Sequence, residues 1–440
     1  MKKLLFNLSL FGAKLVYFFL RVTKLSSGTA IIGYFVLKFC PDFLTYANDK
    51  ILDKKINITG TNGKTTTSGL LTHLIKKSGN SVVNNSMGAN MLTGIVNALA
   101  LQLSIFKNHK YSVIESDEAF VEVIYEKFDA DYLLVTNLFR DQLDRYGELA
   151  TTKRFIQNGI DKKPDIQLLL NADDPLVASI TSKNKSPIYY GIEEVVYTDG
   201  LTYKAPTVAE VFTCPCGKEL KYSKSFYAQQ GHYHCDCGYK RPEVKYSAKV
   251  TLYKTHSVLE INGESFEVPL VGLFNAYNAL GAIALAKELG IKDLNENLKT
   301  FKVAFGRSEI KYLNGKPTLI QLIKNPVGAS EALKSVDLDS NILICINDNY
   351  ADGRDVSWLW DAEFEVLKDA EREIVVSGIR AKDMALRLKY ADVDVSKIRV
   401  IKNIKDAVRY VSENASKSIT ILPTYTALLN INKMKDFKEK

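Results

Sequence analysis

The chain has 440 residues, of which 46% are hydrophobic and 25% charged, and its formal net charge is +8. This length predicts two or three domains whose cores need no disulfide framework. The small positive excess favours an acidic substrate or an anionic lipid. The sequence does not show the interleaved basic and aromatic residues that bind single-stranded nucleic acid, so a nucleic-acid-binding function is excluded.

Residues 1–50 are expected to form an amphipathic helical segment. The run Leu4–Leu20 is apolar and follows two lysines, as in a signal peptide, but Lys14 interrupts it and no Ala-x-Ala cleavage site follows. The run is also short for a membrane span. The polar residues recur at near-heptad spacing on one side of a helix: Lys3, Asn7, Lys14 and Arg21. The helix therefore lies on a membrane surface, packs on a neighbouring domain or, less in keeping with its length, anchors the chain.

A phosphate-binding loop is predicted directly after the first strand candidate, Lys55–Thr59. The loop residues are Gly60, Thr61, Asn62, Gly63, Lys64, Thr65 and Thr66, and a helical pattern follows them. Glycines let backbone N–H groups approach phosphate oxygens, and the helix N-terminus adds positive charge. Lys64 would supply a point charge for the terminal phosphates and Thr65 a hydroxyl for Mg²⁺. The alternative is a tight turn with a surface lysine.

Strand and helix patterns alternate from residue 51 onward, which predicts a doubly wound α/β sheet. Polar motifs follow several of these strands. They lie at the carboxyl ends of the strands, where α/β sheets of this kind bind their ligands. The further strand candidates are Ser81–Asn85, Tyr111–Glu115, Asp131–Asn137, Gln167–Asn171, Pro187–Gly191, Ala248–Tyr253 and Ser257–Ile261. An Ala- and Leu-rich helix is expected over Asn275–Leu289. We assign residues 51–305 to this central domain.

Residues 205–245 interrupt the rhythm and are interpreted as a zinc-ribbon insertion. Two Cys-x-Cys-Gly knuckles contribute Cys214, Cys216, Cys235 and Cys237, and four thiolates in two close pairs form a closed tetrahedral zinc site. Such grouping indicates a metal site in a reducing compartment rather than disulfides. His232 and His234 are alternative ligands, although surface or hairpin positions suit them better.

A second α/β unit is predicted over residues 306–440, with strand candidates Asn341–Ile346, Glu373–Ser377, Ile398–Ile401 and Ser418–Leu422. No glutaminase centre is evident in the chain. That chemistry needs an activated cysteine beside a histidine base. Cys40 and Cys345 have no histidine near them in the sequence, and none of the five histidines lies in this last region.

Six motifs occur in an order that resembles the Mur ligase family of ATP-dependent carboxylate–amine ligases. They are GTNGKTTT, the strand-end Glu115, TNLFRDQLDRYGE, LNADDP, FNAYNAL and GRSE. The resemblance covers nearly the whole chain after residue 50. It implies a central ATPase domain with the ribbon inserted and a C-terminal α/β domain.

The resemblance also implies roles for individual residues. Lys64 and the loop amides would hold the β- and γ-phosphates, and Thr65 with Glu115 would bind Mg²⁺. Asn275 matches a position beside the adenine and Arg307 one that reaches the nucleotide from the hinge. Weaker assignments place Asn137, Asp141 and Asp144 on the second-metal or substrate side. The plain alternatives are a solvated loop acid for Glu115, a helix cap for Asn275, and ion pairs with Arg140 and Arg145 for the two aspartates.

The ribbon and the stretch NDNYADGRDVSWLWD, residues 347–361, are similar to the branch of the family that amidates the α-carboxyl of D-glutamate in the lipid II stem peptide. That likeness implies a synthetase subunit in a heterodimer with a GatD-type glutaminase, which supplies ammonia for peptidoglycan biosynthesis in the cytoplasm or at the inner face of the membrane. Asp355 would complete the partner's Cys–His pair, with Asp352 as its rival. The alternative is an acidic surface loop with buried tryptophans.

A rival enzyme function is addition of an amino acid, as in other Mur ligases and folylpolyglutamate synthases. Those enzymes carry a histidine-containing motif where this chain has Ile323-Lys324-Asn325-Pro326. Its absence, together with the ribbon, favours ammonia as the nucleophile.

Overall fold

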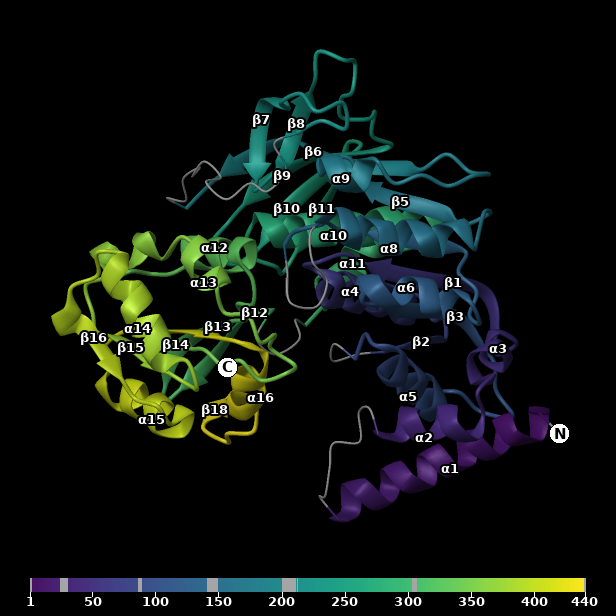
Figure 1. The fold of residues 1–440 in the computed structure, drawn as a ribbon, viewed down its shortest axis with the longest axis horizontal. Coiled ribbons are helices and arrows are strands. Elements are labelled where there is room, and N and C mark those ends of the chain that lie inside the picture. The colour runs from purple at the N-terminus through teal and green to yellow at the C-terminus, as the bar shows by residue number, and fades with distance from the viewer. Residues whose placement is uncertain are drawn as a thin grey trace. The chain divides into compact units, whose positions relative to one another are not determined.

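The computed structural model describes residues 2–23, 31–85, 89–140, 149–199, 211, 213–302 and 307–438. Two compact units divide the chain (Figure 1). The first unit comprises residues 1–138, 149–204 and 211–302, and the second comprises 139–148, 205–210 and 303–440.

The first unit is built on a nine-stranded sheet in the order β11-β10-β9-β6-β5-β4-β1-β3-β2. Seven neighbouring strands of this sheet are parallel, in the order β9, β6, β5, β4, β1, β3 and β2. Strands β10 and β11 extend the sheet from β9 in antiparallel pairs. Their bounds are β1 Ile51–Thr59, β2 Val82–Asn84, β3 His109–Glu115, β4 Tyr132–Val135, β5 Gln167–Asn171, β6 Ile188–Tyr197, β9 Tyr246–Leu252, β10 Ser257–Ile261 and β11 Glu264–Val268. The parallel, doubly wound core confirms the predicted fold class.

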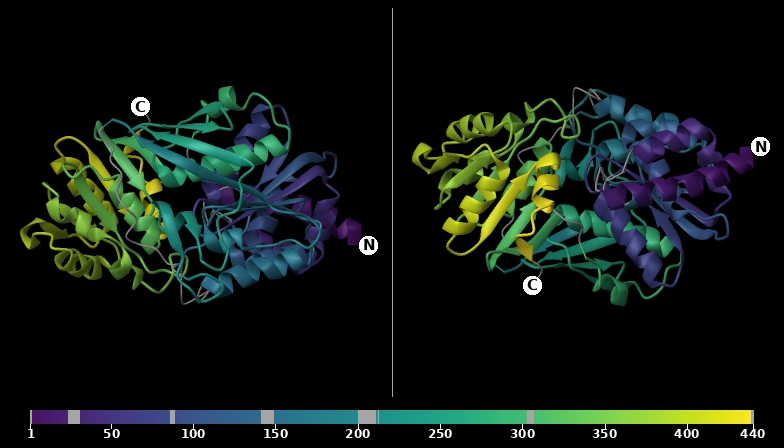
Figure 2. Two further views of the ribbon diagram at one scale, coloured as in Figure 1. Left: turned by 90° about the horizontal axis from the view of Figure 1, so that it is seen from above. Right: turned by 90° about the horizontal axis from the view of Figure 1, so that it is seen from below.

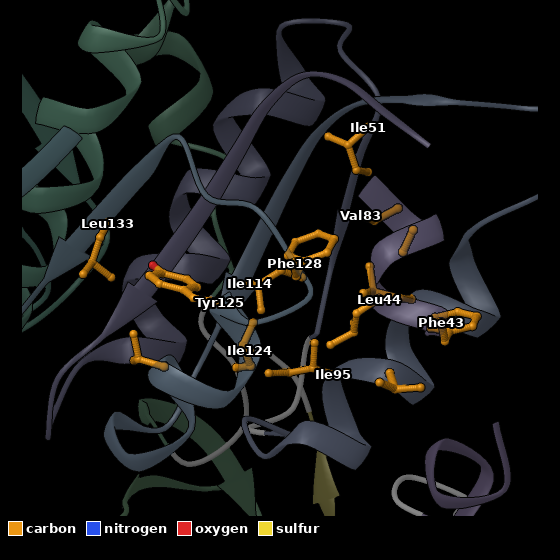
Figure 3. Close-up of a cluster of buried hydrophobic side chains, with 14 of the residues drawn as sticks. Phe43, Leu44, Ile51, Val83, Ile95, Ile114, Ile124, Tyr125, Phe128 and Leu133 are labelled. Carbon is orange, nitrogen blue, oxygen red and sulfur yellow. The ribbon is translucent and has the colours of Figure 1, made fainter. Parts of the chain in front are cut away.

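Helices cover both faces of this sheet because alternate strand residues face opposite sides. Leu133 and Val135 of β4 belong to the core beneath α5, α6 and α8, whereas Leu134 faces α10. The helices are α4 Lys64–Lys77, α5 Leu92–Gln102, α6 Val121–Tyr125, α8 Leu149–Asp161, α9 Pro175–Ala178, α10 Leu273–Glu288 and α11 Leu294–Leu298. Figure 3 shows side chains from the sheet, α3 (Phe43–Asn48), α5 and α6 gathered in the core that contains Leu133.

The described residues before β1 add three helices to that core, α1 Lys2–Thr23, α2 Ile31–Phe39 and α3 Phe43–Asn48. Figures 1 and 2 show α1 and α2 lying side by side. Phe6 and Leu10 of α1 are buried, and the Phe6 ring centroid lies 5.1 Å from that of Phe43. One face of the predicted amphipathic helix is thus packed into the first unit.

The second unit has a seven-stranded sheet in the order β16-β15-β14-β17-β13-β12-β18. Its bounds are β12 Arg307–Leu313, β13 Lys316–Gln321, β14 Asn341–Cys345, β15 Ile374–Ser377, β16 Ile398–Val400, β17 Ile419–Pro423 and β18 Phe437–Lys438. Its α-helices are α12 Pro326–Lys334, α13 Trp358–Asp361, α14 Ala381–Tyr390, α15 Ile404–Asn414 and α16 Tyr425–Asn432. The five strands from β13 to β17 are parallel, and their polar loops leave the carboxyl ends.

Candidate functional site

The predicted phosphate loop joins β1 to α4 and has room for no side chain at either glycine. Gly60 has a φ of 120° and Gly63 a φ of 86°, values that side chains rarely adopt. A Cβ on Gly60 would lie 2.3 Å from Thr136 Oγ1, and one on Gly63 would lie 1.9 Å from Asn278 Oδ1. The two glycines therefore let the loop backbone pass close to Thr136 and Asn278. The loop runs directly into the N-terminus of α4, whose N–H groups and dipole favour an anion.

Residues at the end of β4 hold the loop in place. Asn137 accepts a hydrogen bond from Asn62 N through Oδ1 at 2.8 Å, and its Nδ2 donates to Asn62 O at 3.0 Å. Thr136 Oγ1 donates to the same carbonyl at 2.7 Å, and Thr61 N donates to Asn137 O at 2.9 Å. The Asn137 side chain thus lies on the loop. Asp141 and Asp144 lie outside the described residues.

Lys64 folds back over the loop that precedes it. Its Nζ donates to Gly60 O at 2.5 Å and forms an ion pair with Glu118 Oε2 at 3.1 Å. Both charged side chains are only 8% exposed. A buried pair of this kind fixes the ammonium in space, so phosphate oxygens entering the loop would meet a positioned cation.

Two oxygen ligands for a hard cation lie beside the loop. Thr65 Oγ1, in the first turn of α4, donates to Glu115 Oε1 at 3.2 Å. Glu115 ends β3, and its backbone exchanges hydrogen bonds of 2.8 and 2.7 Å with the Asn85 side chain. A hydroxyl and a carboxylate at a phosphate loop are the protein ligands that Mg²⁺ uses. Thr66 follows on α4 and is buried.

The start of α10 closes the other side of the loop. Asn275 is buried, and its Nδ2 donates to Val271 O at 2.9 Å, so it ties down the backbone just before the helix. Asn278 Nδ2 donates to Asn275 Oδ1 at 3.3 Å and its side chain packs against Gly63. Asn275 therefore contacts Asn278, and Asn278 in turn contacts the phosphate loop.

Sequence reasoning gave no role to Glu118, Thr136 or Asn278. Glu118 follows the strand-end Glu115 closely, Thr136 belongs to the motif TNLFRDQLDRYGE, and Asn278 belongs to FNAYNAL. The contacts of Glu118 with Lys64 and of Asn278 with Gly63 are tertiary, so spacing alone carries no signal for them. The two acids that follow Glu115, Asp117 and Glu118, were the one available hint.

The four predicted zinc ligands meet at one point. All four Sγ atoms lie within 4.8 Å of one another, with 3.5 Å between Cys214 and Cys237 and 3.7 Å between Cys216 and Cys235. Tetrahedral Zn–S bonds require a sulfur separation of about 3.8 Å. The donor set therefore fits Zn²⁺. His232 lies instead on the β7–β8 hairpin (Lys221–Tyr227 and Gln230–His234), where Nε2 contacts Ile192 O at 2.8 Å.

A buried ion pair fastens the ribbon to the central sheet. Arg241, which follows the second knuckle, donates from Nε to Asp173 Oδ1 at 2.6 Å. Asp173 also accepts from Tyr277 Oη at 2.8 Å. Burial raises the pKa of Asp173, and the Arg241 guanidinium opposes that rise. The LNADDP motif thus has a structural role here, because it anchors the ribbon beside α10.

The acidic stretch of the second unit places its two candidate acids in different surroundings. Asp352 is buried and accepts from Thr426 N at 2.7 Å and Thr426 Oγ1 at 2.6 Å. Burial raises the pKa of Asp352. Asp355 is half-buried and accepts from Ser357 N at 2.8 Å. The buried Asp352 carboxylate therefore holds its loop through hydrogen bonds, whereas the Asp355 carboxylate lies nearer the surface.

Two aromatic side chains of this stretch are exposed at the surface. Trp360 is 51% exposed and Tyr350 71% exposed, while Trp358 is half-buried. Arg387 lies 5.8 Å from the Trp360 ring centre and holds the local backbone by donating to Leu359 O. The tryptophans are thus not a purely internal pair. Arg307 opens β12, and its side chain lies outside the described residues.

Comparison with known proteins matches both units. The family model for the Mur ligase middle domain matches residues 58–286, and that for the MurT ligase C-terminal region matches 322–428. The lipid II isoglutaminyl synthase (glutamine-hydrolyzing) subunit MurT of Staphylococcus aureus strain COL is 36% identical over 408 residues, which is 91% of each chain. The corresponding subunit of Streptococcus pneumoniae is 34% identical and covers 94% of this chain and 93% of its own.

Solved structures agree on the fold. A pseudomurein peptide ligase type C from Methanothermus fervidus superposes with a TM-score of 0.68 at 24% identity. The match covers 87% of this chain and 79% of that one. At this identity the likeness establishes the architecture alone.

Proposed function

Because the chain belongs to the MurT family of Mur ligases, whose members are ATP-dependent enzymes, we propose that it amidates the α-carboxyl of D-glutamate in the lipid II stem peptide. The observation that carries this proposal is the identity of 34–36% with two MurT subunits over more than 90% of each chain. The product would be D-isoglutamine, made for peptidoglycan synthesis.

The first step is activation of the carboxylate, which is a poor acyl donor because oxide would have to leave. The carboxylate oxygen attacks the γ-phosphorus of ATP, the bond to ADP breaks, and an acyl phosphate forms. Lys64 and the loop amides would stabilise the charge on the transferring group. Mg²⁺, held by Thr65 and Glu115, would neutralise phosphate charge when bound.

The second step forms the amide bond. The nitrogen of ammonia attacks the acyl carbon, phosphate leaves with the electron pair, and the nitrogen loses a proton. Ammonia is mostly protonated near neutral pH and is then not nucleophilic. A GatD-type glutaminase partner would therefore deliver it in a protected path. The exposed aromatics and acids around Asp355 suit contact with such a subunit, which Asp355 would complete by orienting the histidine of its Cys–His pair.

The ribbon is proposed to hold a structural zinc ion. Four cysteine ligands leave no coordination position open for a substrate. The metal would hold the two knuckles together. It would thereby keep Arg241, which follows the second knuckle, in position for its ion pair with Asp173.

The test is reconstitution of the chain with a glutaminase subunit, lipid II, ATP, Mg²⁺ and glutamine. Mass spectrometry should show replacement of one hydroxyl by an amino group on the stem peptide, together with one ADP per product. A gain of an amino-acid mass when amino acids are supplied would instead assign the chain to the adding ligases. ADP release with an unchanged peptide would refute lipid II as the substrate.

A further inference from the structure

Helix α1 presents a continuous stripe of large apolar side chains to solvent. They recur every three or four residues, so they share one helix face, and each is between 56% and 67% exposed: Leu4, Leu8, Phe11, Leu15, Phe18 and Val22. An apolar surface of this extent normally marks an interaction site.

The opposite face of α1 is fixed in the protein core. Phe6, Leu10 and Ala13 are 2%, 1% and 4% exposed and pack with α3 and α5. At 3.6 residues per turn, this buried face and the exposed stripe are centred about 150° apart around the helix axis. The helix thus carries one face for the core and a second apolar face that the first unit leaves uncovered.

Helix α2 extends the exposed patch. Its buried residues face α5, where Gly33 packs so closely that a Cβ would lie 1.8 Å from Thr93 O. Its outward residues are Ile31, Tyr34, Phe35 and Phe39, all at least 45% exposed. We call the six α1 stripe residues and these four the α1–α2 surface.

The segment that carries this surface is basic up to Asp42, which pairs with Lys2 Nζ at 3.2 Å. Residues 1–41 contain Lys2, Lys3, Lys14, Arg21, Lys24 and Lys38 and no aspartate or glutamate. Lys3, Arg21 and Lys38 are exposed. An apolar face flanked by basic residues has the chemistry of a helix that lies at the surface of an anionic bilayer.

We propose that the α1–α2 surface docks on an anionic lipid bilayer, with α1 lying in the plane of the interface. Among the described helices, the segment Lys2–Val22 is also long and apolar enough to cross a membrane. Crossing would pull Phe6 and Leu10 out of the core, so lying is favoured. A second copy of the chain is a poorer occupant, because its basic residues would face a surface of like charge. The proposal stands apart from the amidation reaction, although a lipid-linked substrate agrees with it.

Flotation of the purified full-length chain with vesicles tests this surface. Vesicles of phosphatidylcholine with phosphatidylglycerol are compared with phosphatidylcholine alone, without lipid II or nucleotide. We expect the anionic vesicles to bind the chain about tenfold or more tightly, with the difference shrinking as salt rises. Failure of flotation would overturn this proposal and leave the amidation proposal intact.

Matched variants separate the apolar and basic contributions. Phe11→Ser/Leu15→Ser/Phe18→Ser removes exposed side chains only, so the thermal melt should stay unchanged while vesicle binding falls about tenfold or more. Ile379→Ser/Leu386→Ser/Tyr390→Ser changes apolar residues of the second unit that are 48% to 67% exposed, and this variant should bind normally. Lys3→Gln/Arg21→Gln should reduce the preference for anionic vesicles.

Three results would overturn the proposal. Equal binding by the Phe11 triple variant and the unchanged chain would remove the α1 stripe from the contact. A dimer in sedimentation velocity that this variant abolishes, without vesicle binding, would assign the surface to a second copy. Retention in bacterial membranes after an alkaline carbonate wash would indicate a spanning helix.

Discussion

The close fit of Gly63 against Asn278 makes this glycine the most sensitive position of the phosphate loop. Gly63→Ala and the control Gly79→Ala both place a side chain on left-handed backbone, with φ values of 86° and 79°. That conformation costs about 1 kcal/mol for each. Only Gly63→Ala adds the contact with Asn278, because nothing lies within 4 Å of a Cβ on Gly79.

We therefore expect Gly63→Ala to lower the free energy of unfolding by about 2 kcal/mol more than Gly79→Ala. It should also abolish binding of a fluorescent ATP analogue, whereas Gly79→Ala should bind it normally. Urea unfolding and a binding titration provide the two measurements. Equal losses of stability in both variants would mean that Asn278 can move away from the loop.

Lys64 carries the second residue-scale prediction. Lys64→Ala should reduce ADP formation about 100-fold or more, because the transferring phosphoryl group loses its positioned cation. Lys76→Ala removes an exposed lysine near the other end of α4 and should leave the rate unchanged. Co-purification with the glutaminase subunit should survive both changes. Loss of the complex with Lys64→Ala would contradict the proposal that the first unit binds ATP and the second contacts the partner.

The local part of this site could be predicted from the sequence because its residues are consecutive. A strand, two glycines, a lysine and a threonine follow one another, so the order of residues specifies their arrangement. Glu118 and Asn278 could not be predicted in this way. Their contacts depend on how β3 and α10 pack beside the loop.

At the scale of elements, the ribbon joins its proposed zinc site to the central sheet through the ion pair of Arg241 with Asp173. Zinc binding should therefore stabilise the first unit as well as the knuckles. Cys214→Ser should remove zinc and lower the melting temperature. Cys345→Ser alters a thiol buried in the second unit, so it should lower the melting temperature while the zinc content stays unchanged. Metal analysis and calorimetry measure both, and full zinc content in Cys214→Ser would disprove the site.

Element prediction succeeded where strands are short buried runs and failed where pairing depends on the hairpin partner. The run Gln167–Asn171 was predicted with the bounds of β5. The hairpins β10–β11 and β12–β13 turn at Asn262-Gly263 and Asn314-Gly315, each with φ values near 50° and above 70°. These Asn-Gly turns were the available signal for β11, β12 and β13, which the alternation of strands and helices does not reveal.

At the scale of the whole molecule, the proposed ATP site belongs to one unit and the proposed partner contact to the other. A variant of Asp355 can distinguish these two functions, because ammonia added to the solution can replace the ammonia that the partner would supply. Asp355→Asn should lower glutamine-dependent amidation about 100-fold or more, since the partner's histidine would lose its orienting carboxylate. The rate with added ammonium should stay within about twofold of the unchanged complex, because the proposed ligase mechanism gives this residue no part in acyl phosphate formation.

Two neighbouring acids make this prediction specific. Asp361→Asn alters an exposed carboxylate of the same stretch and should change neither rate. Asp352→Asn disturbs the hydrogen bonds to Thr426 that hold the loop, so it should lower stability and glutamine-dependent activity together. Equal loss with both nitrogen sources in Asp355→Asn would place this residue in the ligase reaction instead. A selective loss in Asp352→Asn at unchanged stability would transfer the proposed role to Asp352, so a melt of each variant complex belongs beside the rates.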